Sequence, residues 1–225
     1  MPDVRIRVVD GLKLPPGYRE VLRPGEPVRC RDGRVRRLPR YFYEFSSWDE
    51  AKATDLAPDF RAWELLDVDV REHALLRMDG PRYLPLAAAL LAGQLQLLRE
   101  RAGTLVHVSA NGGYRSPSHR LSDEPTPHNW GAAANLYRVG DDWLDSEAAI
   151  TEYGRKAREL SPLFRVLPYG RTAGQTDDHL HLDVGFVTVV PHGRPEEGED
   201  GELPRDEARG DDGNGGAADG AGDEA

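Results

Sequence analysis

The chain has 225 residues, with 39 acidic and 29 basic side chains and a formal net charge of −10. Residues 193–225 alone contain twelve acidic residues and three arginines, so the rest of the chain is close to neutral. This balance excludes a general nucleic-acid-binding protein, which needs a basic surface to bind phosphates. The most apolar run, residues 84–92, is about half of the ~20 residues that a membrane-spanning helix requires. We therefore expect no membrane span.

The sequence also lacks the marks of classical secretion. Charged residues follow Met1 closely, and no apolar segment of the kind found in signal peptides comes after them. Cys30 is the only cysteine, so no internal disulfide can form. We expect a cytoplasmic protein, or one exported by a non-classical or phage-type route.

Composition divides the chain into three parts. Residues 191–225 consist mainly of Gly, Ala, Asp and Glu, with one Leu and no aromatic residue. Such a segment cannot bury enough apolar surface to offset its conformational entropy, which predicts disorder. It is interpreted as a solubilising extension, with an acidic interaction tail as the alternative. Residues 41–190 are predicted to form the main domain, and residues 1–40 to pack on it.

The N-terminal part is predicted to contain a strand and a hairpin. Apolar and charged residues alternate over residues 4–8, which is typical of a half-buried strand. Asp32-Gly33 between residues 28–31 and 34–37 favours a two-residue hairpin turn. One face of this hairpin is basic, with Arg29, Arg31, Arg34 and Arg36. A charged edge that discourages aggregation is the favoured interpretation, and a site for an anionic polymer is the alternative.

Helices and strands follow without a regular alternation, which predicts the α+β class. The capping box at Ser47 to Glu50 predicts a short helix, and a leucine-rich helix is expected from near Pro85 to Gly103. Further elements are expected as a buried strand at 104–109, a helix at 146–160 and a strand at 179–186.

The last of these strands carries the most unusual chemistry. Its period of two places His179, His181 and Asp183 on one face and apolar residues on the other. Two imidazoles and a carboxylate on such a face must be solvated, paired or bound to a metal. His128 lies about fifty residues upstream. Neutral imidazoles suit zinc, whose catalytic sites combine three protein ligands with one open position.

Three blocks of residues carry a family resemblance. Gly-Tyr-Arg-Ser-Pro at 113–117, Thr-x-His-x-x-Gly-x-Ala-x-Asn at 126–135 and Asp-His-x-His at 178–181 follow one another in that order. In order and spacing they resemble the signature of the zinc D-alanyl-D-alanine carboxypeptidases, metallopeptidases of the hedgehog/DD-peptidase superfamily that cleave peptidoglycan stem peptides. The resemblance implies an α+β fold in which a small antiparallel sheet with flanking helices carries a zinc site.

The resemblance also implies a set of metal ligands. His128 and His181 match two of them, and Asn135 stands where the family has an aspartate. An amide oxygen is a weaker metal ligand than a carboxylate, and the change from aspartate to asparagine removes a negative charge. Metal affinity should therefore be lower than in the family. Less ligand charge also leaves the metal a stronger Lewis acid, as three-histidine zinc sites illustrate. Asp183 is a conceivable substitute, although it lies two residues, roughly 7 Å, along the strand from His181.

The remaining matched residues take their roles from the same resemblance. Asp178 is implied as the carboxylate that accepts a proton from the activated water, with His179 orienting the site or stabilising the oxyanion. Arg115 and Tyr114 are implied in binding the substrate, with Arg115 facing its carboxylate or the developing negative charge. Arg115 could instead pair with a nearby acid, and His179 could merely fill the sheet face.

Two functional hypotheses follow. The first is an active zinc peptidase or amidase acting on a small peptide or peptidoglycan stem peptide that ends in D-alanine. The retention of Asp178, His179 and Arg115 favours it. The second is a catalytically silent protein of the same fold that binds peptide or cell wall, which Asn135 favours.

Overall fold

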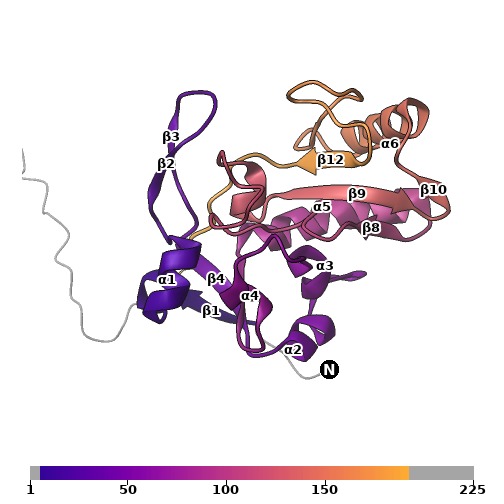
Figure 1. Cartoon of the computed structure of the whole chain (residues 1–225). Coiled ribbons are helices and arrows are strands. Elements are labelled where there is room, and N and C mark those ends of the chain that lie inside the picture. The colour runs from indigo at the N-terminus through magenta and orange to yellow at the C-terminus, as the bar shows by residue number, and fades with distance from the viewer. Residues whose placement is uncertain (1–5, 193–225) are drawn as a thin grey trace, which may run out of the picture. The chain divides into compact units, whose positions relative to one another are not determined.

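A five-stranded antiparallel sheet carries the central part of the fold (Figure 1). Its middle strand, β9 (Ala133–Val139), pairs with β8 (Val106–Val108), β10 (Asp142–Trp143) and β12 (Leu180–Asp183). β11 (Arg165–Val166) extends the sheet beyond β12. Every one of these pairings is antiparallel, and the topology lacks a repeated βαβ unit, which is compatible with an α+β protein.

The computed structural model describes residues 6–192, and those up to 191 belong to one compact unit. The acidic segment from 193 onward, which the sequence predicts to be disordered, lies outside the described residues, as do residues 1–5. Three smaller sheets complete the strand inventory: β1 (Arg7–Asp10), β4 (Tyr41–Phe45) and β7 (Arg82–Pro85); β2 (Pro27–Arg29) and β3 (Val35–Arg37); β5 (Asp55–Ala57) and β6 (Phe60–Arg61).

The helices surround these sheets and bury their apolar faces. The α-helices are α1 (Pro16–Leu22), α2 (Trp48–Ala53), α3 (Ala62–Leu66), α4 (Ala74–Arg77), α5 (Ala87–Ala102) and α6 (Glu147–Leu160), with 3₁₀ turns η1 (Gly11–Lys13) and η2 (Pro127–Trp130). The helix α5 contacts β8 and β9, and α6 contacts β11 and β12. The leucines of α5 and strands β9 and β12 share one hydrophobic core. Among residues 6–192, no helix has both the length and the apolarity needed to cross a membrane.

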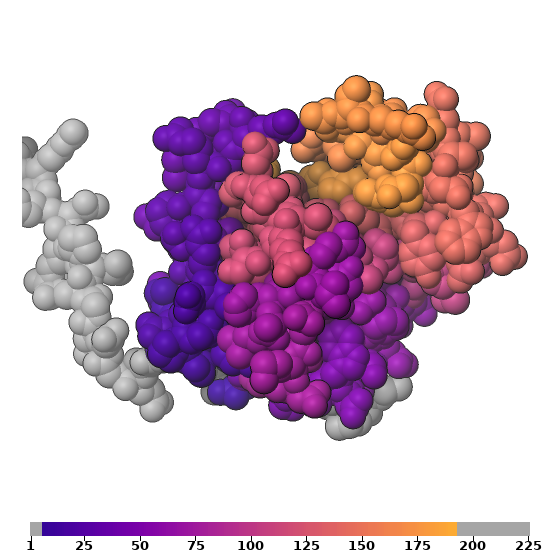
Figure 2. Space-filling view, in the orientation of Figure 1, coloured from indigo at the N-terminus to yellow at the C-terminus, as the bar shows by residue number. Residues whose placement is uncertain are grey.

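The hairpin of β2 and β3 forms as the Asp-Gly turn predicts, and it is packed against the C-terminal part of the described chain. Gly33 has a φ of +77°, and Arg36 closes an ion pair with Asp32 at 2.6 Å. The Arg36 guanidinium also lies 4.1 Å from the centre of the Phe186 ring, and Trp130 packs edge-on against that ring. In the space-filling view a hollow separates the purple hairpin from the orange region that carries β12 (Figure 2).

Several predicted elements end at different residues in the structure. Pro85 does not open the long helix but ends β7, where it pairs with Phe42, and α5 begins two residues later. The final strand stops at Asp183 instead of continuing to residue 186. There the Asp183 side chain accepts a hydrogen bond from the backbone N–H of Gly185, which has a φ of +81°. This local turn takes the chain out of the sheet.

Two adjacent leucines of α5 test the packing of the core. Leu91 is completely buried, whereas Leu90 is 51% exposed. We expect Leu91→Ala to lower the free energy of unfolding by about 2–5 kcal/mol, because it leaves a cavity. The matched change Leu90→Ala should stay within about 0.5 kcal/mol of the original protein. Urea denaturation followed by circular dichroism measures both, and equal losses would show that α5 does not face the core as described.

Candidate functional site

The face of the five-stranded sheet opposite the core carries polar side chains. Along β9, Leu136 and Val139 are buried in the core, whereas Tyr137 and Arg138 between them are only partly buried. A register irregularity between β8 and β9 leaves Tyr137 without a direct partner, so two successive side chains can turn away from the core. Asn135 precedes this irregularity, and its side chain contacts His181 on β12.

His181 is fixed by partners on both ring nitrogens. Its Nε2 lies 3.1 Å from an oxygen of Asp183, and its Nδ1 lies 2.9 Å from Oδ1 of Asn135. A carboxylate only accepts hydrogen bonds, so Nε2 carries the proton and donates it. In the neutral ring Nδ1 then carries no proton, and its lone pair faces Asn135. Asp183 therefore orients His181, and the structure places it behind the imidazole and not beside Nδ1.

His128 reaches the same place from the 3₁₀ turn η2. Its Nδ1 donates to the backbone carbonyl of Gly113 at 2.8 Å, which leaves Nε2 as the lone-pair nitrogen. The His128 and His181 ring centres lie 5.1 Å apart. Burial, the positive charge of Arg115 and the neighbouring His181 lower the pKa of His128 well below its usual value. Among the described residues, none hydrogen-bonds to Nε2 of His128.

Glycine is required where His128 is anchored. A Cβ on Gly113 would lie only 2.3 Å from the carbonyl oxygen of Leu65. The backbone N–H of Tyr114 donates to the same oxygen at 2.7 Å, which fixes the loop in place. The close approach of this loop to α3 therefore determines where the carbonyl that orients His128 lies.

Asp178 and His179 lie just before β12. The Asp178 carboxylate is 80% exposed and lies 2.5 Å from Nδ1 of His179. Burial lowers the pKa of His179, although the carboxylate of Asp178 opposes that effect. The neighbouring His181 and the positive charge of Arg115 lower it further. An accessible carboxylate and a third imidazole thus directly precede the strand that carries His181.

Arg115 has no acidic partner among the described residues. Its Nε donates to the backbone carbonyl of Asn111 at 2.6 Å. Within the described part of the chain, no carboxylate oxygen lies within 4.0 Å of its guanidinium. Burial, and the charge of Arg71, lower its pKa to about 10. Pairing with a nearby acid, the simpler alternative for Arg115, is therefore not observed among residues 6–192.

The loop that carries Arg115 is held by buried polar residues that the sequence analysis missed. Glu72 is 4% exposed and accepts hydrogen bonds from the backbone and hydroxyl of Ser116 at 3.0 and 2.7 Å. His119 accepts at Nδ1 from Leu121 N–H and donates from Nε2 to Asn111 Oδ1 at 2.8 Å. Glu72 and Ser116 are 44 positions apart in the sequence, so no local pattern could indicate their contact.

Tyr114, matched to substrate binding by the resemblance, lies in a different environment. It is 4% exposed and belongs to the hydrophobic core, where burial raises the pKa of its hydroxyl well above its usual value. The structure thus brings together His128, Asn135 and His181, with the backbone of Arg115 bonded to His128. Asp178 is bonded to His179, two residues before His181, whereas the Tyr114 side chain packs inward.

The donor atoms at this site are two imidazoles and one carboxamide. Among the described residues, no three or more His, Cys, Asp or Glu side chains are grouped so that they could hold a metal ion. His128 and His181 are two such side chains, and Asn135 adds a carboxamide oxygen beside them. The lone pairs at Nε2 of His128 and Nδ1 of His181 still suit a borderline-soft metal such as zinc.

Comparisons with known proteins found no matching protein-family model, no matching curated protein and no matching solved structure. The resemblance carried by the three sequence blocks therefore stays a prediction.

The buried His119 makes a testable contribution to acid sensitivity. Burial lowers its pKa in the folded protein, so the unfolded chain takes up the proton first and stability falls as the pH drops below about 6.5. We expect His119→Gln, which keeps a donor for Asn111, to reduce the stability lost between pH 7 and pH 5 by up to about 2 kcal/mol. Urea unfolding at pH 7, 6 and 5 with a chelator present measures this. An unchanged pH dependence would contradict the assignment.

Proposed function

We propose that this chain is a zinc-dependent peptidase of the D-alanyl-D-alanine carboxypeptidase type, which hydrolyses a peptide bond in peptidoglycan stem peptides. The observation that supports it most is the convergence of His128, His181 and Asn135, with both imidazoles oriented by hydrogen bonds on their far nitrogens. Such outer hydrogen bonds fix the tautomer and increase ligand basicity at known metal sites. The hedgehog/DD-peptidase-like fold and the substrate class belong to this proposal and rest on the sequence resemblance.

In the proposed site, Nε2 of His128, Nδ1 of His181 and Oδ1 of Asn135 would hold the metal. When bound, zinc would supply a water activated near neutral pH and a Lewis acid for the carbonyl. Asp178, exposed and close to His179, would act as the proton acceptor. Arg115, which has no acidic partner among residues 6–192, binds the terminal carboxylate of the peptide through its guanidinium.

A catalytically silent binding module is the second candidate, and Asn135 favours it. If the amide group is turned so that its NH₂ faces Nδ1 of His181, at the observed separation of 2.9 Å, the two side chains satisfy each other without a metal. The two candidates differ in a direct measurement, because only the peptidase needs the metal.

The metal is tested by its affinity. We expect the protein to bind one zinc ion, and His128→Ala combined with His181→Ala to abolish binding while circular dichroism shows an intact fold. Asn135→Asp should raise the affinity at least tenfold, or about 1.4 kcal/mol, because a carboxylate is a stronger ligand than an amide. Competition with a chelator of known affinity measures each variant. Stoichiometric zinc in the double variant would remove the two histidines from the site.

The reaction is tested with a peptide ending in two D-alanines and an excess of zinc. We expect Asp178→Asn to reduce D-alanine release by about 10² to 10⁴-fold without weakening substrate binding, since an amide cannot accept the proton. Arg115→Ala should weaken binding of the free peptide far more than of its C-terminally amidated form, which lacks the carboxylate. Binding of the peptide without any hydrolysis by the zinc-loaded protein would favour the silent module.

A further inference from the structure

The hairpin of β2 and β3 is strongly basic in a chain whose net charge is negative. Residues 27–37 contain five arginines and one acid, Asp32, whereas the whole chain has a formal net charge of −10. Asp32 pairs with Arg36 at 2.6 Å, and Glu124 contacts Arg31 at 3.6 Å with both side chains largely exposed. An exposed pair of that kind contributes at most about 1 kcal/mol. Positive charge therefore remains on the hairpin after these pairs have formed.

The register divides the arginines between the two faces of the hairpin. The loop is one residue longer than the two-residue turn that the sequence favours, because β2 and β3 pair with Arg29 opposite Val35. Arg36 then lies opposite the buried Val28 on the inner face, whereas Arg29 and Arg37 lie on the outer, exposed face. The prediction that Arg29 and Arg36 share one basic face is therefore wrong, and the exposed charge is that of Arg29 and Arg37.

These two arginines are held in place without being neutralised. Arg29 donates from Nη1 to the carbonyl of Gly33 at 2.9 Å, and Arg37 donates from Nη1 to the carbonyl of Gly25 at 3.1 Å. No carboxylate among residues 6–192 lies within 4.0 Å of either guanidinium. A guanidinium has five N–H donors, and in each case one of them has an acceptor among the described residues. A side chain that the backbone already orders loses less conformational entropy when its other donors bind an anion.

The hairpin that presents these arginines is fixed to the rest of the protein at its base. Its buried side chains share a core cluster with Trp130, and they are Val28, Cys30 and Leu38. The indole Nε1 of Trp130 also donates to the backbone carbonyl of Arg37 at 3.1 Å. Above this base the two strands project from the strands around them (Figure 1). The outer face is thus rigidly placed and open to a long ligand.

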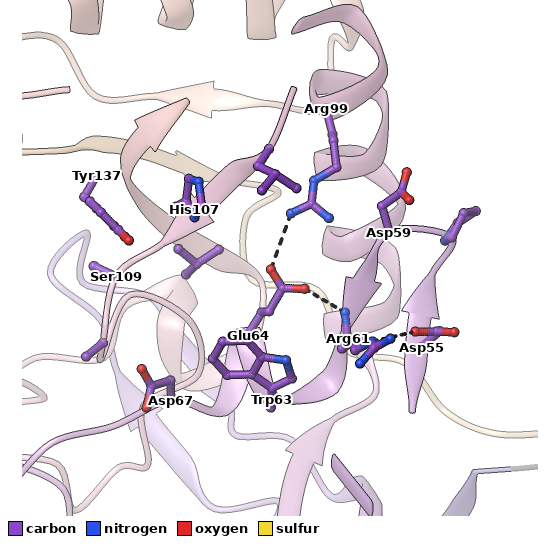
Figure 3. Close-up of a pocket in the computed structure, with 14 residues that line it drawn as sticks. Asp55, Asp59, Arg61, Trp63, Glu64, Asp67, Arg99, His107, Ser109 and Tyr137 are labelled. Carbon is purple, nitrogen blue, oxygen red and sulfur yellow. Dashed lines mark hydrogen bonds and ion pairs between the residues drawn. The ribbon is translucent and has the colours of Figure 1, made fainter. Parts of the chain in front are cut away.

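The arginines around the largest cavity show the opposite arrangement. This cavity is bounded by β8, β9, α3 and α5, and its wall contains four acidic side chains against two arginines. Arg61 pairs there with Asp55 at 3.5 Å, and Arg99 pairs with Glu64 at 3.4 Å (Figure 3). Both arginines are compensated, and the excess of acids repels anions. Arg61, exposed but paired, is therefore a matched control for the arginines of the hairpin.

The outer face of the hairpin suits a linear chain of phosphate groups. Arg37 lies diagonally across the two strands from Arg29, a separation of about 7–8 Å. A guanidinium binds phosphate through two parallel hydrogen bonds, and successive contacts along a flexible polyanion each release counterions. Val35, beside Arg37 on this face, is 59% exposed, and no aromatic residue of β2 or β3 offers a ring for a base to stack on. A phosphate chain without bases therefore fits this face better than a single-stranded nucleic acid.

We propose that the outer face of the β2–β3 hairpin binds a linear polymer of phosphate groups that carries no bases, with one phosphate on Arg29 and another on Arg37. Arg34, exposed next to the loop and also without a carboxylate within 4.0 Å among residues 6–192, extends the contact toward the tip. This binding is electrostatic and requires neither the metal nor the proposed peptidase reaction. A charged edge that only prevents aggregation would need the same charges but would bind no polymer.

The probe is a short linear inorganic polyphosphate with a fluorophore at one end, mixed with full-length protein in metal-free buffer at increasing salt concentrations. Fluorescence anisotropy measures the binding constant. Each phosphate neutralised on a single chain contributes about −0.7 to the slope of the logarithm of that constant against the logarithm of the salt concentration, so three arginines give a slope of about −2. Arg29→Gln combined with Arg37→Gln should reduce the slope to about −0.7 and weaken binding at low salt at least tenfold, because only Arg34 is left.

Arg61→Gln should leave both the affinity and the slope unchanged, since Asp55 already pairs with Arg61. Circular dichroism checks that each variant keeps its fold. No binding by the original protein at low salt, an unchanged affinity in the double variant, or an equal loss in Arg61→Gln overturns the inference. A DNA oligonucleotide with the same number of phosphates should bind no more tightly than the polyphosphate. Tighter binding of the oligonucleotide would make the hairpin a nucleic-acid site and would also overturn the inference.

Discussion

The antiparallel register between β9 and β12 is the constraint on which the candidate site depends. It places Asn135 directly opposite His181, and one residue further along each strand the apolar side chains enter the core. A shift of one residue would exchange the two faces and bury the polar pair among leucines. Because Leu136, Leu180 and Leu182 are completely buried, the core resists that shift, and the packing of α5 and α6 determines the register of the site.

The second requirement is the loop between β8 and β9, which carries Arg115 and ends in η2. It has little regular structure and is held instead by hydrogen bonds from distant residues: the carbonyl of Leu65 bonds Tyr114, and Glu72 bonds Ser116. The loop in turn orients His128 through the carbonyl of Gly113. A rigid sheet thus supplies two of the proposed ligands, and a loop fixed by buried polar contacts supplies the third ligand and the arginine.

The sequence predicts the elements whose signals are local. The Asp-Gly hairpin, the helix α6 and the leucine-rich helix α5 each form close to the expected residues, although Leu90 of α5 is exposed and not in the core. It could not predict the contact of Asn135 with His181, 46 positions apart, without the resemblance, because strand pairing between distant segments leaves no periodic pattern. The role of Asp183 could not be predicted either. Period two places it on the face of His181, but only the structure shows that it accepts a hydrogen bond from Nε2.

The electrostatics of the site bear on how a metal and a substrate depend on each other in the proposed function. The three proposed ligands are neutral side chains, and the positive charge of Arg115 lies close enough to lower the pKa of both His128 and His179. The same positive charge disfavours the binding of a divalent cation by these ligands. A carboxylate bound to Arg115 compensates that charge, so a peptide with a free C-terminus and the metal favour each other's binding, and linkage makes this effect reciprocal. An aspartate at position 135 would weaken the dependence by supplying the negative charge from the protein itself.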